Sequence, residues 1–330
     1  MPIVNSQKEF DKYKEFIGKS KYANFMQYPS WSKVKKNWSH DFVYVEENKQ
    51  IIAAMSVIGI KNDNGKTFLY APRGPVCDFS DYKLVQKLIK EAEALREKYD
   101  AFLLRIDPEF EFKEREVKLY KSLGYEFRSV CDDIYSFIQP RYNLMINLTS
   151  KDEGKVFKNF SSKGRYNVRK SFKSNIVTKL DTSKESLDNF YNLTKIMAKR
   201  QGINHRPKSY FKKLIKHMNA MIFSAYHEDQ ILSASLLIPN KDKLYYLYAA
   251  SSNEKRNLMP NYNMIWEEIK YAIENGYSYL DLGGVFSLSK KDGLYRFKEN
   301  FCYPNKYKAY IGELDVVYDR EKYEEFLKQK

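Results

Sequence analysis

Three charged residues stand at the ends of predicted strands and helices, where side chains often do chemistry. Asp107 ends an apolar strand predicted over residues 101–107, and a carboxylate there could accept a proton from an amine nucleophile. Arg206, which follows His205 at the start of a predicted helix, could bind a phosphate group bidentately. Lys298 adjoins an apolar stripe, and an ammonium group fixed in this way could stabilise an oxyanion or a phosphate.

Each of these residues also has an ordinary structural explanation. An aspartate followed by a proline, as at Pro108, commonly begins a turn. An arginine at the start of a helix is often simply exposed to solvent. Lys298 could cover apolar surface with its aliphatic stem while its amine reaches water. The residue types alone leave both kinds of explanation open.

Several common active-site motifs are missing from the sequence, namely GxxxxGK[ST], GxGxxG and GxSxG, and the four histidines lack zinc-ligand spacing. A CoA-dependent acyltransferase usually holds the pyrophosphate on the backbone N–H groups of a glycine-rich turn before a helix. The stretches in that position are APRGPVCDFSDYKL (71–84) and SSNEKRNLMPNYNM (251–264). The second has no glycine, and the single glycine of the first precedes a proline, which lacks an N–H. A CoA site is therefore not expected.

The elements that must position these residues occur twice. Residues 42–60 read as two strands around a polar turn, followed by a strand, a helix with apolar residues at 3.6 spacing, and the strand 101–107. The same order returns from 221–239 to 277–284. Hairpin, strand, helix and strand is the order of a GNAT-like acetyltransferase fold. The sequence therefore predicts an α/β (α+β) protein with two such domains in tandem, built on mixed sheets with flanking helices.

Charge and hydropathy narrow the classes of function. The 330 residues include 57 Lys and Arg against 42 Asp and Glu, a net charge of +15, which favours a polyanionic partner. A genome of low GC content, whose proteins carry lysine at most exposed positions, would give the same excess of positive charge. The longest mostly apolar run, residues 51–60, is too short to span a bilayer. Three widely separated cysteines give no disulfide framework. We therefore expect a cytoplasmic protein that is not transmembrane.

One segment stands out for its charge. Residues 151–180 carry nine Lys or Arg and two acidic residues, with four aromatic residues interleaved. Cations alternating with aromatic rings suit a phosphate backbone and stacked bases. An amphipathic helix with a solvated basic face would show the same composition, and the sequence favours neither explanation.

Seven segments, in order along nearly the whole chain, resemble the Fem family of non-ribosomal peptidyltransferases, and most of all its short FemX type. They are FMQYPSWSKVKKNW (25–38), LLRIDPEF (103–110), IQPRYNLMINL (138–148), MAKRQGINHRPKSYF (197–211), YYLYAASS (245–252), YLDLGGV (279–285) and LYRFKENF (294–301). A collinear set of this kind is far more specific than any one segment.

The resemblance implies an aminoacyltransferase. Members of the family move an amino acid from aminoacyl-tRNA to the stem peptide of a peptidoglycan precursor, usually to the side-chain amine of the third-position lysine, and so build the interpeptide bridge. The sequence from 150 to 330 shows no pair of long heptad stretches, so it resembles the type without a coiled-coil arm, which uses UDP-MurNAc-pentapeptide. Lipid II remains an alternative acceptor, and alanine, serine and glycine are all candidates for transfer. Neither a metal nor a cofactor is implied, and we expect a monomer.

The resemblance also implies a division of labour between domains. The first domain, residues 1–143 with 309–330, would bind the precursor. The second, residues 144–308, would be inserted into the first and serve the aminoacyl-tRNA. Two cations, Lys35 and Arg206, would bind the UDP diphosphate from opposite domains. The same groove would be lined by Tyr210, Tyr246 and Tyr248.

Three residues would carry the chemistry. Asp107 is the candidate to orient or deprotonate the attacking amine, unless the leaving ribose oxygen and its neighbouring hydroxyl move the proton. Phe297 would stack on the terminal adenine of the tRNA. Lys298 would stabilise the tetrahedral oxyanion or the leaving oxygen. The basic segment would contact the tRNA through Lys163, Arg165, Arg169 and Lys170.

Two other classes of function remain. A small-molecule N-acyltransferase that uses CoA would fit the predicted fold, but the glycine-rich turns are missing. A non-enzymatic RNA-binding protein would explain the charge, but it would give no role to Lys35, Arg206 and Lys298 together.

Overall fold

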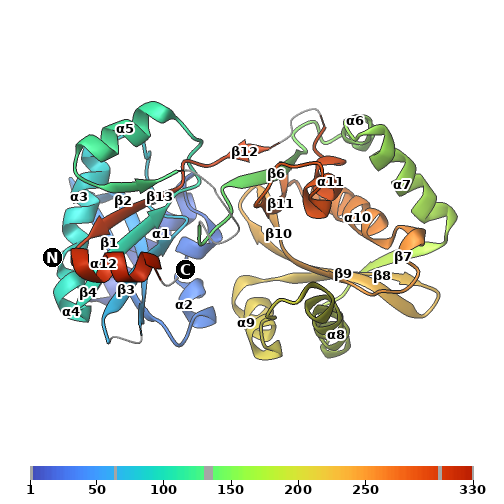
Figure 1. The fold of residues 1–330 in the computed structure, drawn as a ribbon, viewed down its shortest axis with the longest axis horizontal. Coiled ribbons are helices and arrows are strands. Elements are labelled where there is room, and N and C mark those ends of the chain that lie inside the picture. The colour runs from blue at the N-terminus through green and yellow to red at the C-terminus, as the bar shows by residue number, and fades with distance from the viewer. Residues whose placement is uncertain (1–2, 63–64, 130–136, 304–306, 329–330) are drawn as a thin grey trace. The chain divides into compact units, whose positions relative to one another are not determined.

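A computed structural model describes the protein over residues 3–62, 65–129, 137–303 and 307–328. The chain divides into two compact units, unit 1 with Met1–Arg141 and Ala309–Lys330, and unit 2 with Tyr142–Lys308. Unit 2 is therefore one continuous insertion in the chain of unit 1 (Figure 1). The sequence places the first boundary two residues later, at 143/144. Tyr142 and Asn143 belong to unit 2 because they begin a strand of its sheet.

Unit 1 is built on a six-stranded mixed sheet with the strand order β1-β2-β3-β4-β13-β5. The strands are β1 (Ser39–Glu47), β2 (Gln50–Lys61), β3 (Thr67–Pro72), β4 (Ala101–Asp107), β5 (Glu126–Arg128) and β13 (Glu313–Val317). The helices are α1 (Gln7–Lys19), α2 (Ser30–Val34), α3 (Tyr82–Ala92), α4 (Ala94–Tyr99), α5 (Glu114–Ser122) and α12 (Arg320–Lys328), with the 3-10 helix η1 (Phe25–Gln27). Because β13 lies between β4 and β5, the end of the chain completes the interior of this sheet.

The local patterns of unit 1 explain its elements. The strand predicted over 101–107 is β4, which is buried at every residue, as expected of a strand covered on both faces. The predicted helix is α3, which buries four apolar side chains at helical spacing, Val85, Leu88, Ile89 and Ala92. The sheet and this helix enclose the core of the unit.

Unit 2 is built on a seven-stranded sheet with the strand order β12-β6-β11-β10-β9-β8-β7. The strands are β6 (Tyr142–Asn147), β7 (Ile176–Leu180), β8 (Met221–His227), β9 (Gln230–Asn240), β10 (Lys243–Ser251), β11 (Tyr279–Val285) and β12 (Lys308–Ala309). The helices are α6 (Glu153–Lys158), α7 (Ser162–Lys173), α8 (Lys184–Gln201), α9 (Lys208–Met218), α10 (Pro260–Glu274) and α11 (Gly293–Glu299), with the 3-10 helix η2 (Arg256–Leu258). Within this unit, α8 and α9 cover one face of the sheet and α7 and α10 the other (Figure 1).

The ends of α8 follow the signals in the sequence. The Ser183 side chain accepts a hydrogen bond from the backbone N–H of Ser186, and Gly202 ends the helix with a positive φ of 65°. The basic segment 151–180 forms two helices and a strand, α6, α7 and β7, rather than one amphipathic helix.

Over the ranges that the structure describes, no helix is long and apolar enough to cross a membrane. Cys77 in unit 1 and Cys302 in unit 2 are buried free thiols. Cys131 lies outside the described residues.

Candidate functional site

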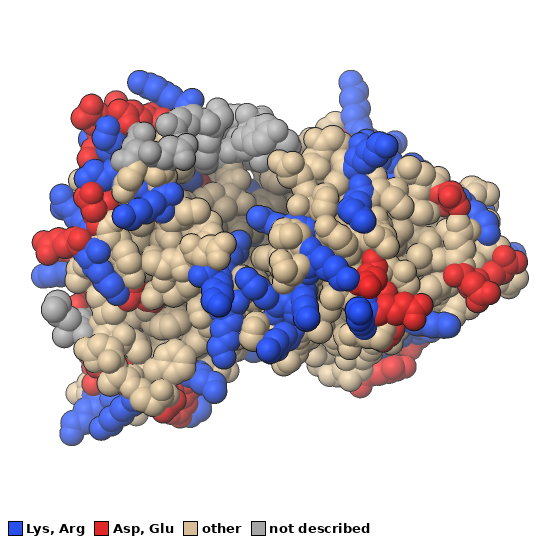
Figure 2. All heavy atoms as spheres, turned by 90° about the horizontal axis from the view of Figure 1, so that it is seen from below, with Lys and Arg blue, Asp and Glu red and all other residues tan. Residues whose placement is uncertain are grey.

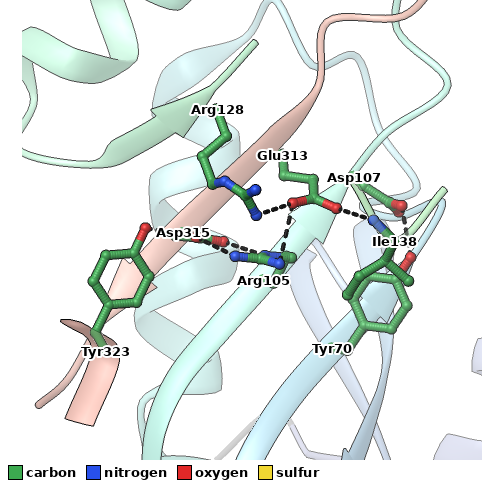
Figure 3. Close-up of polar contacts among 8 residues, drawn as sticks. All are labelled: Tyr70, Arg105, Asp107, Arg128, Ile138, Glu313, Asp315 and Tyr323. Carbon is green, nitrogen blue, oxygen red and sulfur yellow. Dashed lines mark hydrogen bonds and ion pairs between the residues drawn. The ribbon is translucent and has the colours of Figure 1, made fainter. Parts of the chain in front are cut away.

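Asp107 ends β4 and is almost completely buried, with 3 % of its surface exposed. Both carboxylate oxygens accept hydrogen bonds. The Tyr70 hydroxyl donates to Oδ2 at 2.6 Å, and the backbone N–H of Arg73 donates to Oδ1 at 2.5 Å. Figure 3 shows the Tyr70 hydroxyl pointing at this carboxylate. The Asp107 side chain therefore accepts hydrogen bonds from residues more than 30 positions away in the sequence. The alternative explanation, that Asp107 only begins a turn before Pro108, does not account for these contacts.

Burial controls the acidity of this carboxyl group. Burial raises the pKa of Asp107 to about 7, while the Arg73 guanidinium and the Tyr70 hydroxyl act in the opposite direction. The negative charge of Glu313 raises this pKa further. A carboxyl group with such a pKa is about half ionised at neutral pH, which suits a general base that accepts a proton and later returns it.

Arg73 was not among the predicted site residues, although it helps to hold Asp107. Its φ is 54°, its guanidinium carbon lies 5.0 Å from the centroid of the Tyr310 ring, and its Nη2 donates to the Pro140 carbonyl oxygen at 3.3 Å. The sequence shows only an arginine between a proline and a glycine, which is typical of a turn. Neither Arg73 nor Tyr70 carries a local signal for this role, because both act through contacts between distant parts of the chain.

A buried charge network joins β4 to β13. Arg105 donates two hydrogen bonds of 2.6 Å to Asp315, and its Nη1 forms an ion pair with Glu313 at 3.1 Å. Glu313 in turn accepts hydrogen bonds from Arg128 at 2.8 Å and from the backbone N–H of Ile138 at 2.7 Å (Figure 3). The network fixes the returning end of the chain against the strand that carries the candidate base.

Lys35 directly follows α2 and lies near two tryptophan rings. Its Nζ is 5.7 Å from the centroid of Trp31 and 5.6 Å from that of Trp38. Such contacts orient an ammonium group while leaving its positive charge in place. The position of the Lys35 ammonium group is compatible with its predicted role, the binding of a phosphate group.

The two central parallel strands of unit 2 diverge. β10 and β11 are paired only over residues 243–245 and 279–281, although both strands continue beyond these residues. The pairing of β10 with β9 shifts just beyond this point, and so does that of β11 with β6. In unit 1 the equivalent strands β3 and β4 stay paired as far as Pro72 and Asp107. In unit 2, β10 and β11 therefore separate beyond Tyr245 and Asp281, and we call this opening the fork. In unit 1 the corresponding strands β3 and β4 remain paired to their ends.

Lys298 reaches the fork from α11. Its Nζ donates to the Gly284 carbonyl oxygen at 2.8 Å, and 7 % of the residue is exposed. Burial lowers the pKa of Lys298 to about 8, and the nearby Asp281 carboxylate opposes this shift. The amine therefore does not reach out into water, as a lysine that only covers apolar surface would do. An ammonium group held in this way has further N–H bonds that could donate to a developing oxyanion.

Gly283 shapes the strand beneath this amine. Its φ of 75° is rarely adopted by residues with a side chain, and its N–H donates to the Asp281 carboxylate at 2.8 Å. Asp281 is buried and also accepts a hydrogen bond from Asn143 at 3.3 Å. These contacts fix the bulged part of β11 to which Lys298 binds.

Phe297 belongs to a cluster of three aromatic rings. Its ring centroid lies 5.2 Å from that of Tyr262 and 5.4 Å from that of Phe301, both in edge-on contacts. The residue is half-buried and lines a cavity at the start of α10. Its ring therefore has a surface, facing this cavity, on which a ligand could stack.

Arg206 lies in the loop before α9 and is exposed. Its guanidinium carbon lies 5.6 Å from the centroid of the Tyr210 ring, and the Tyr248 hydroxyl donates to the Tyr210 hydroxyl at 3.3 Å. The structure thus brings together three of the residues predicted to line the precursor groove.

Tyr246 lies on the other face of the sheet. A β-bulge at Leu247 separates Tyr246 from Tyr248 in the pairing of β10 with β9. Tyr248 contacts Phe211 of α9, whereas Tyr246 packs into the core on the side of α10. Burial and the nearby Glu268 carboxyl group raise the pKa of Tyr246. Two tyrosines separated by one residue were predicted to line one groove, and the bulge sends them to opposite faces.

The four residues predicted to contact tRNA lie on α7 and are Lys163, Arg165, Arg169 and Lys170. Lys163 and Tyr166 are both exposed. Arg165 donates to the Phe160 carbonyl oxygen at 2.5 Å and so holds the turn between α6 and α7. Arg169 lies over the ring of Phe157. On the face drawn in Figure 2, Lys and Arg side chains outnumber Asp and Glu, in keeping with the net charge of +15.

No group of three or more His, Cys, Asp or Glu residues is placed to hold a metal ion within the described part of the chain. Unit 1 offers a buried carboxyl group with a raised pKa at Asp107, and unit 2 offers a buried ammonium group with a lowered pKa at Lys298.

Comparisons with known proteins agree with the predicted resemblance. The model of the FemAB family matches residues 6–223 and 215–327. The UDP-N-acetylmuramoylpentapeptide-lysine N(6)-alanyltransferase of Weissella viridescens is 34% identical, over 99% of this chain and 100% of that protein. The lipid II:glycine glycyltransferase of Staphylococcus haemolyticus is 25% identical, over 94% of this chain and 91% of that protein.

Solved structures support the predicted fold. The crystal structure of FemX aligns with a TM-score of 0.85 at 23% identity, over 98% of this chain and 99% of that chain. A tandem GNAT protein from the clavulanic acid biosynthesis pathway aligns with a TM-score of 0.57 at 10% identity, over 96% and 98% of the two chains. The prediction of two GNAT-like domains in tandem is therefore confirmed.

Proposed function

The chain belongs to the FemAB family, and on that basis we propose that it transfers an amino acid from aminoacyl-tRNA to the side-chain amine of the third stem-peptide residue of UDP-MurNAc-pentapeptide. The relatives named above are aminoacyltransferases, and this chain is an enzyme of the same kind. The alanyltransferase acts on a lysine, so lysine is the proposed acceptor and alanine the first amino acid to test, with serine and glycine next.

The fork at Lys298 is the observation that carries this proposal. Acyl transfer needs a donor for the oxyanion that forms on the carbonyl oxygen, held where water is excluded. Lys298 is a buried ammonium group at the point where β10 and β11 separate, and Phe297 offers a ring surface one residue away. Unit 1 has no such opening along the described pairing of β3 and β4. The acyl donor is therefore assigned to unit 2.

The proposed reaction is aminolysis of an ester. The acceptor nitrogen attacks the aminoacyl carbonyl carbon, a C–N bond forms, and the C–O bond to the ribose breaks. Lys298 donates to the oxyanion. Asp107 accepts the proton that the amine loses, and the leaving ribose oxygen takes up a proton, so no net proton is consumed. The hydroxyl beside the leaving oxygen is the alternative carrier of this proton.

Lys35, Arg206, Tyr210 and Tyr248 remain the proposed contacts of the precursor, with the two cations on its diphosphate. Lipid II, the acceptor named for the glycyltransferases, is the alternative substrate. We place the reaction in the cytoplasm and assign it to a monomer, with no metal or cofactor. Lys163 and Lys170, on the surface of α7, remain proposed contacts of the tRNA, with Arg165 and Arg169 beside them.

A transfer assay tests the function directly. Purified protein is mixed with UDP-MurNAc-pentapeptide and with tRNAs charged with radiolabelled alanine, serine or glycine, and label is counted in the muropeptide. We expect label with one or more of these tRNAs. Replacing Lys298 by alanine should lower turnover by about 10²–10³, because an oxyanion donor is lost.

The matched control is Lys290→Ala, which removes a surface lysine paired with Glu299 and should leave turnover unchanged. Thermal unfolding of all three proteins checks that they are folded. If no tRNA gives label with either the nucleotide-linked or the lipid-linked precursor, the proposed function is wrong. If Lys298→Ala transfers as well as the wild type, Lys298 has no part in the reaction.

A further inference from the structure

Arg73 is the only buried residue among the described non-glycine residues that have a positive φ. Its φ is 54°, and 7 % of its surface is exposed. The others are exposed, apart from the half-buried Met259. A residue with a side chain is strained in this left-handed conformation, and such strain persists only where the surrounding structure enforces it. The conformation of Arg73 is therefore imposed by its contacts inside unit 1.

The turn that carries Arg73 is held by a buried side chain. Gln27, which is fully buried, donates a hydrogen bond to the Pro72 carbonyl oxygen at 2.7 Å. It also accepts a hydrogen bond from the backbone N–H of Ser56 at 2.8 Å. These contacts hold the turn in the conformation in which the backbone N–H of Arg73 donates to Asp107.

The guanidinium group of Arg73 lies within electrostatic reach of the same carboxyl group. Its contacts are with the Pro140 carbonyl oxygen and the Tyr310 ring, and it forms no ion pair with a carboxylate of the described residues. Burial opposes its positive charge, whereas the negative charges of Asp107 and Glu109 favour it and leave the pKa of Arg73 raised. The guanidinium group is therefore a buried cation that acts on Asp107 without a direct bond.

The charges around Asp107 come from several elements. The Tyr70 hydroxyl of β3 donates to the carboxylate, and Glu313 of β13 opposes its ionisation (Figure 3). The negative charge of Glu313 is offset by ion pairs of 3.1 and 2.8 Å with the two arginines of the buried network. Among all these charges, that of Arg73 has the largest effect on Asp107.

We propose that Arg73 is the positioning residue of Asp107. Its backbone N–H fixes one carboxylate oxygen, and its guanidinium group favours the ionised form, in which the carboxylate can accept a proton from the acceptor amine. The second part of this inference rests on the proposed function, which supplies the amine. One residue would thus set both the orientation of the candidate base and the pH at which it works.

The first measurement follows Asp107 directly and needs no substrate. Full-length protein is labelled with ¹³C at the aspartate carboxyl carbons, and the NMR signal that is missing from Asp107→Asn is followed as pH is varied. Arg73→Gly removes the guanidinium group but keeps a backbone N–H on a residue that adopts positive φ without strain. Arg73→Lys keeps a positive charge. The matched control is Arg141→Gln, because Arg141 is a half-buried arginine whose Nε donates to the Tyr310 carbonyl oxygen at 2.9 Å.

We expect the midpoint of the Asp107 titration to move to higher pH by about one unit in Arg73→Gly, because the carboxylate loses its main counter-charge. Arg73→Lys should recover most of this shift, and Arg141→Gln should leave the midpoint unchanged. If Arg73→Gly does not fold by circular dichroism, Arg73→Gln removes the same charge. An unchanged midpoint without the guanidinium group, an equal shift in Arg141→Gln, or an equal shift in Arg73→Lys would overturn the assignment.

The transfer assay connects Arg73 to the reaction. The acid limb of kcat/KM should move together with the titration midpoint, so Arg73→Gly should lose about tenfold at pH 6 and much less at pH 9. The same loss at every pH would mean that Arg73 only supports the fold, and the proposal would be wrong. If the midpoint moves as expected but no precursor is labelled with any tRNA, the effect of Arg73 on Asp107 stands and the proposed function is wrong.

Discussion

Asp107 and Lys298 titrate close to neutral pH for the same physical reason. Burial disfavours the charged form of each, which raises the pKa of the carboxyl group to about 7 and lowers that of the ammonium group to about 8. A base must be ionised to accept a proton, and an oxyanion donor must be protonated. The two groups are therefore both in their active forms only in a narrow range of pH.

We expect kcat/KM for transfer to rise as pH increases through about 7 and to fall above about 8. Initial rates measured across this range check it. Lys298→Arg should move the alkaline limb to higher pH in whatever activity remains, because a guanidinium group stays charged. A profile that is flat across both pKa values would show that neither group limits the reaction.

Glu268 makes a second prediction at the scale of a single residue. It is fully buried in α10, hydrogen-bonded to the Ser235 hydroxyl, and burial raises its pKa from 4.5 to about 8. In the folded state it is therefore protonated at pH 7, whereas in the unfolded state it is ionised. Stability is lost as pH rises from the unfolded pKa toward the folded pKa, at a cost of about 3 kcal/mol at pH 7.

Glu268→Gln should remove most of this pH dependence. Urea unfolding at several pH values between about 5 and 9 should show a shallower fall in stability for the variant than for the wild type. Glu267→Gln is the control, because Glu267 is only half-buried and paired with Lys270. If both variants follow the wild-type curve, the Glu268 carboxyl group is not the source of the pH dependence.

At the scale of elements, the contact between β4 and β13 holds the end of the chain in unit 1. Asp315 accepts two hydrogen bonds from the fully buried Arg105 and a third from the Tyr323 hydroxyl of α12. A buried ion pair is costly to break, because the remaining charge has no partner and no water. The network therefore holds β13 in one register against β4 and joins both strands to α12.

Asp315→Ala should lower the free energy of unfolding by about 3–5 kcal/mol. Arg320→Ala breaks ion pairs with Glu126 and Glu324 at the surface, and it should cost much less stability than Asp315→Ala, because water and salt screen exposed charges. Chemical denaturation of the two variants gives the comparison. Equal losses would mean that the buried network stabilises the fold no more than an exposed pair does.

At the scale of the whole molecule, the two units differ in how the chain builds them. Unit 2 uses one continuous stretch, Tyr142–Lys308, whereas unit 1 needs residues from both ends of the chain. The last of these residues supply β13, an interior strand of the sheet. Removing them would separate β4 from β5 and leave Arg105 without its carboxylates.

A fragment of residues 142–308 should therefore fold on its own, with cooperative thermal unfolding. A chain that ends at residue 308 should keep that transition and lose the one that belongs to unit 1. Circular dichroism and calorimetry on both fragments distinguish these outcomes. If the chain ending at 308 still shows both transitions, β13 is not needed to fold unit 1.

The sequence by itself determined the order of elements and the residues on which the chemistry was placed. Alternation and 3.6 periodicity are local properties, so β3, β4 and α3 lie where they were predicted. Asp107 and Lys298 could be singled out because a charge at the end of an apolar strand or on an apolar helix stripe is visible in the sequence.

The tertiary structure decided everything that depends on contacts between distant residues. The bulge at Leu247 sends Tyr246 and Tyr248 to opposite faces, and no local pattern marks it. Tyr70 and Arg73 reach Asp107 from more than 30 residues away. The fork in unit 2 exists because the pairing of β10 with β11 ends early, whereas β3 and β4 of unit 1 stay paired to their ends. Burial, which exists only after packing, set the pKa values of Asp107, Lys298 and Glu268, because desolvation acts on a charge through every element around it.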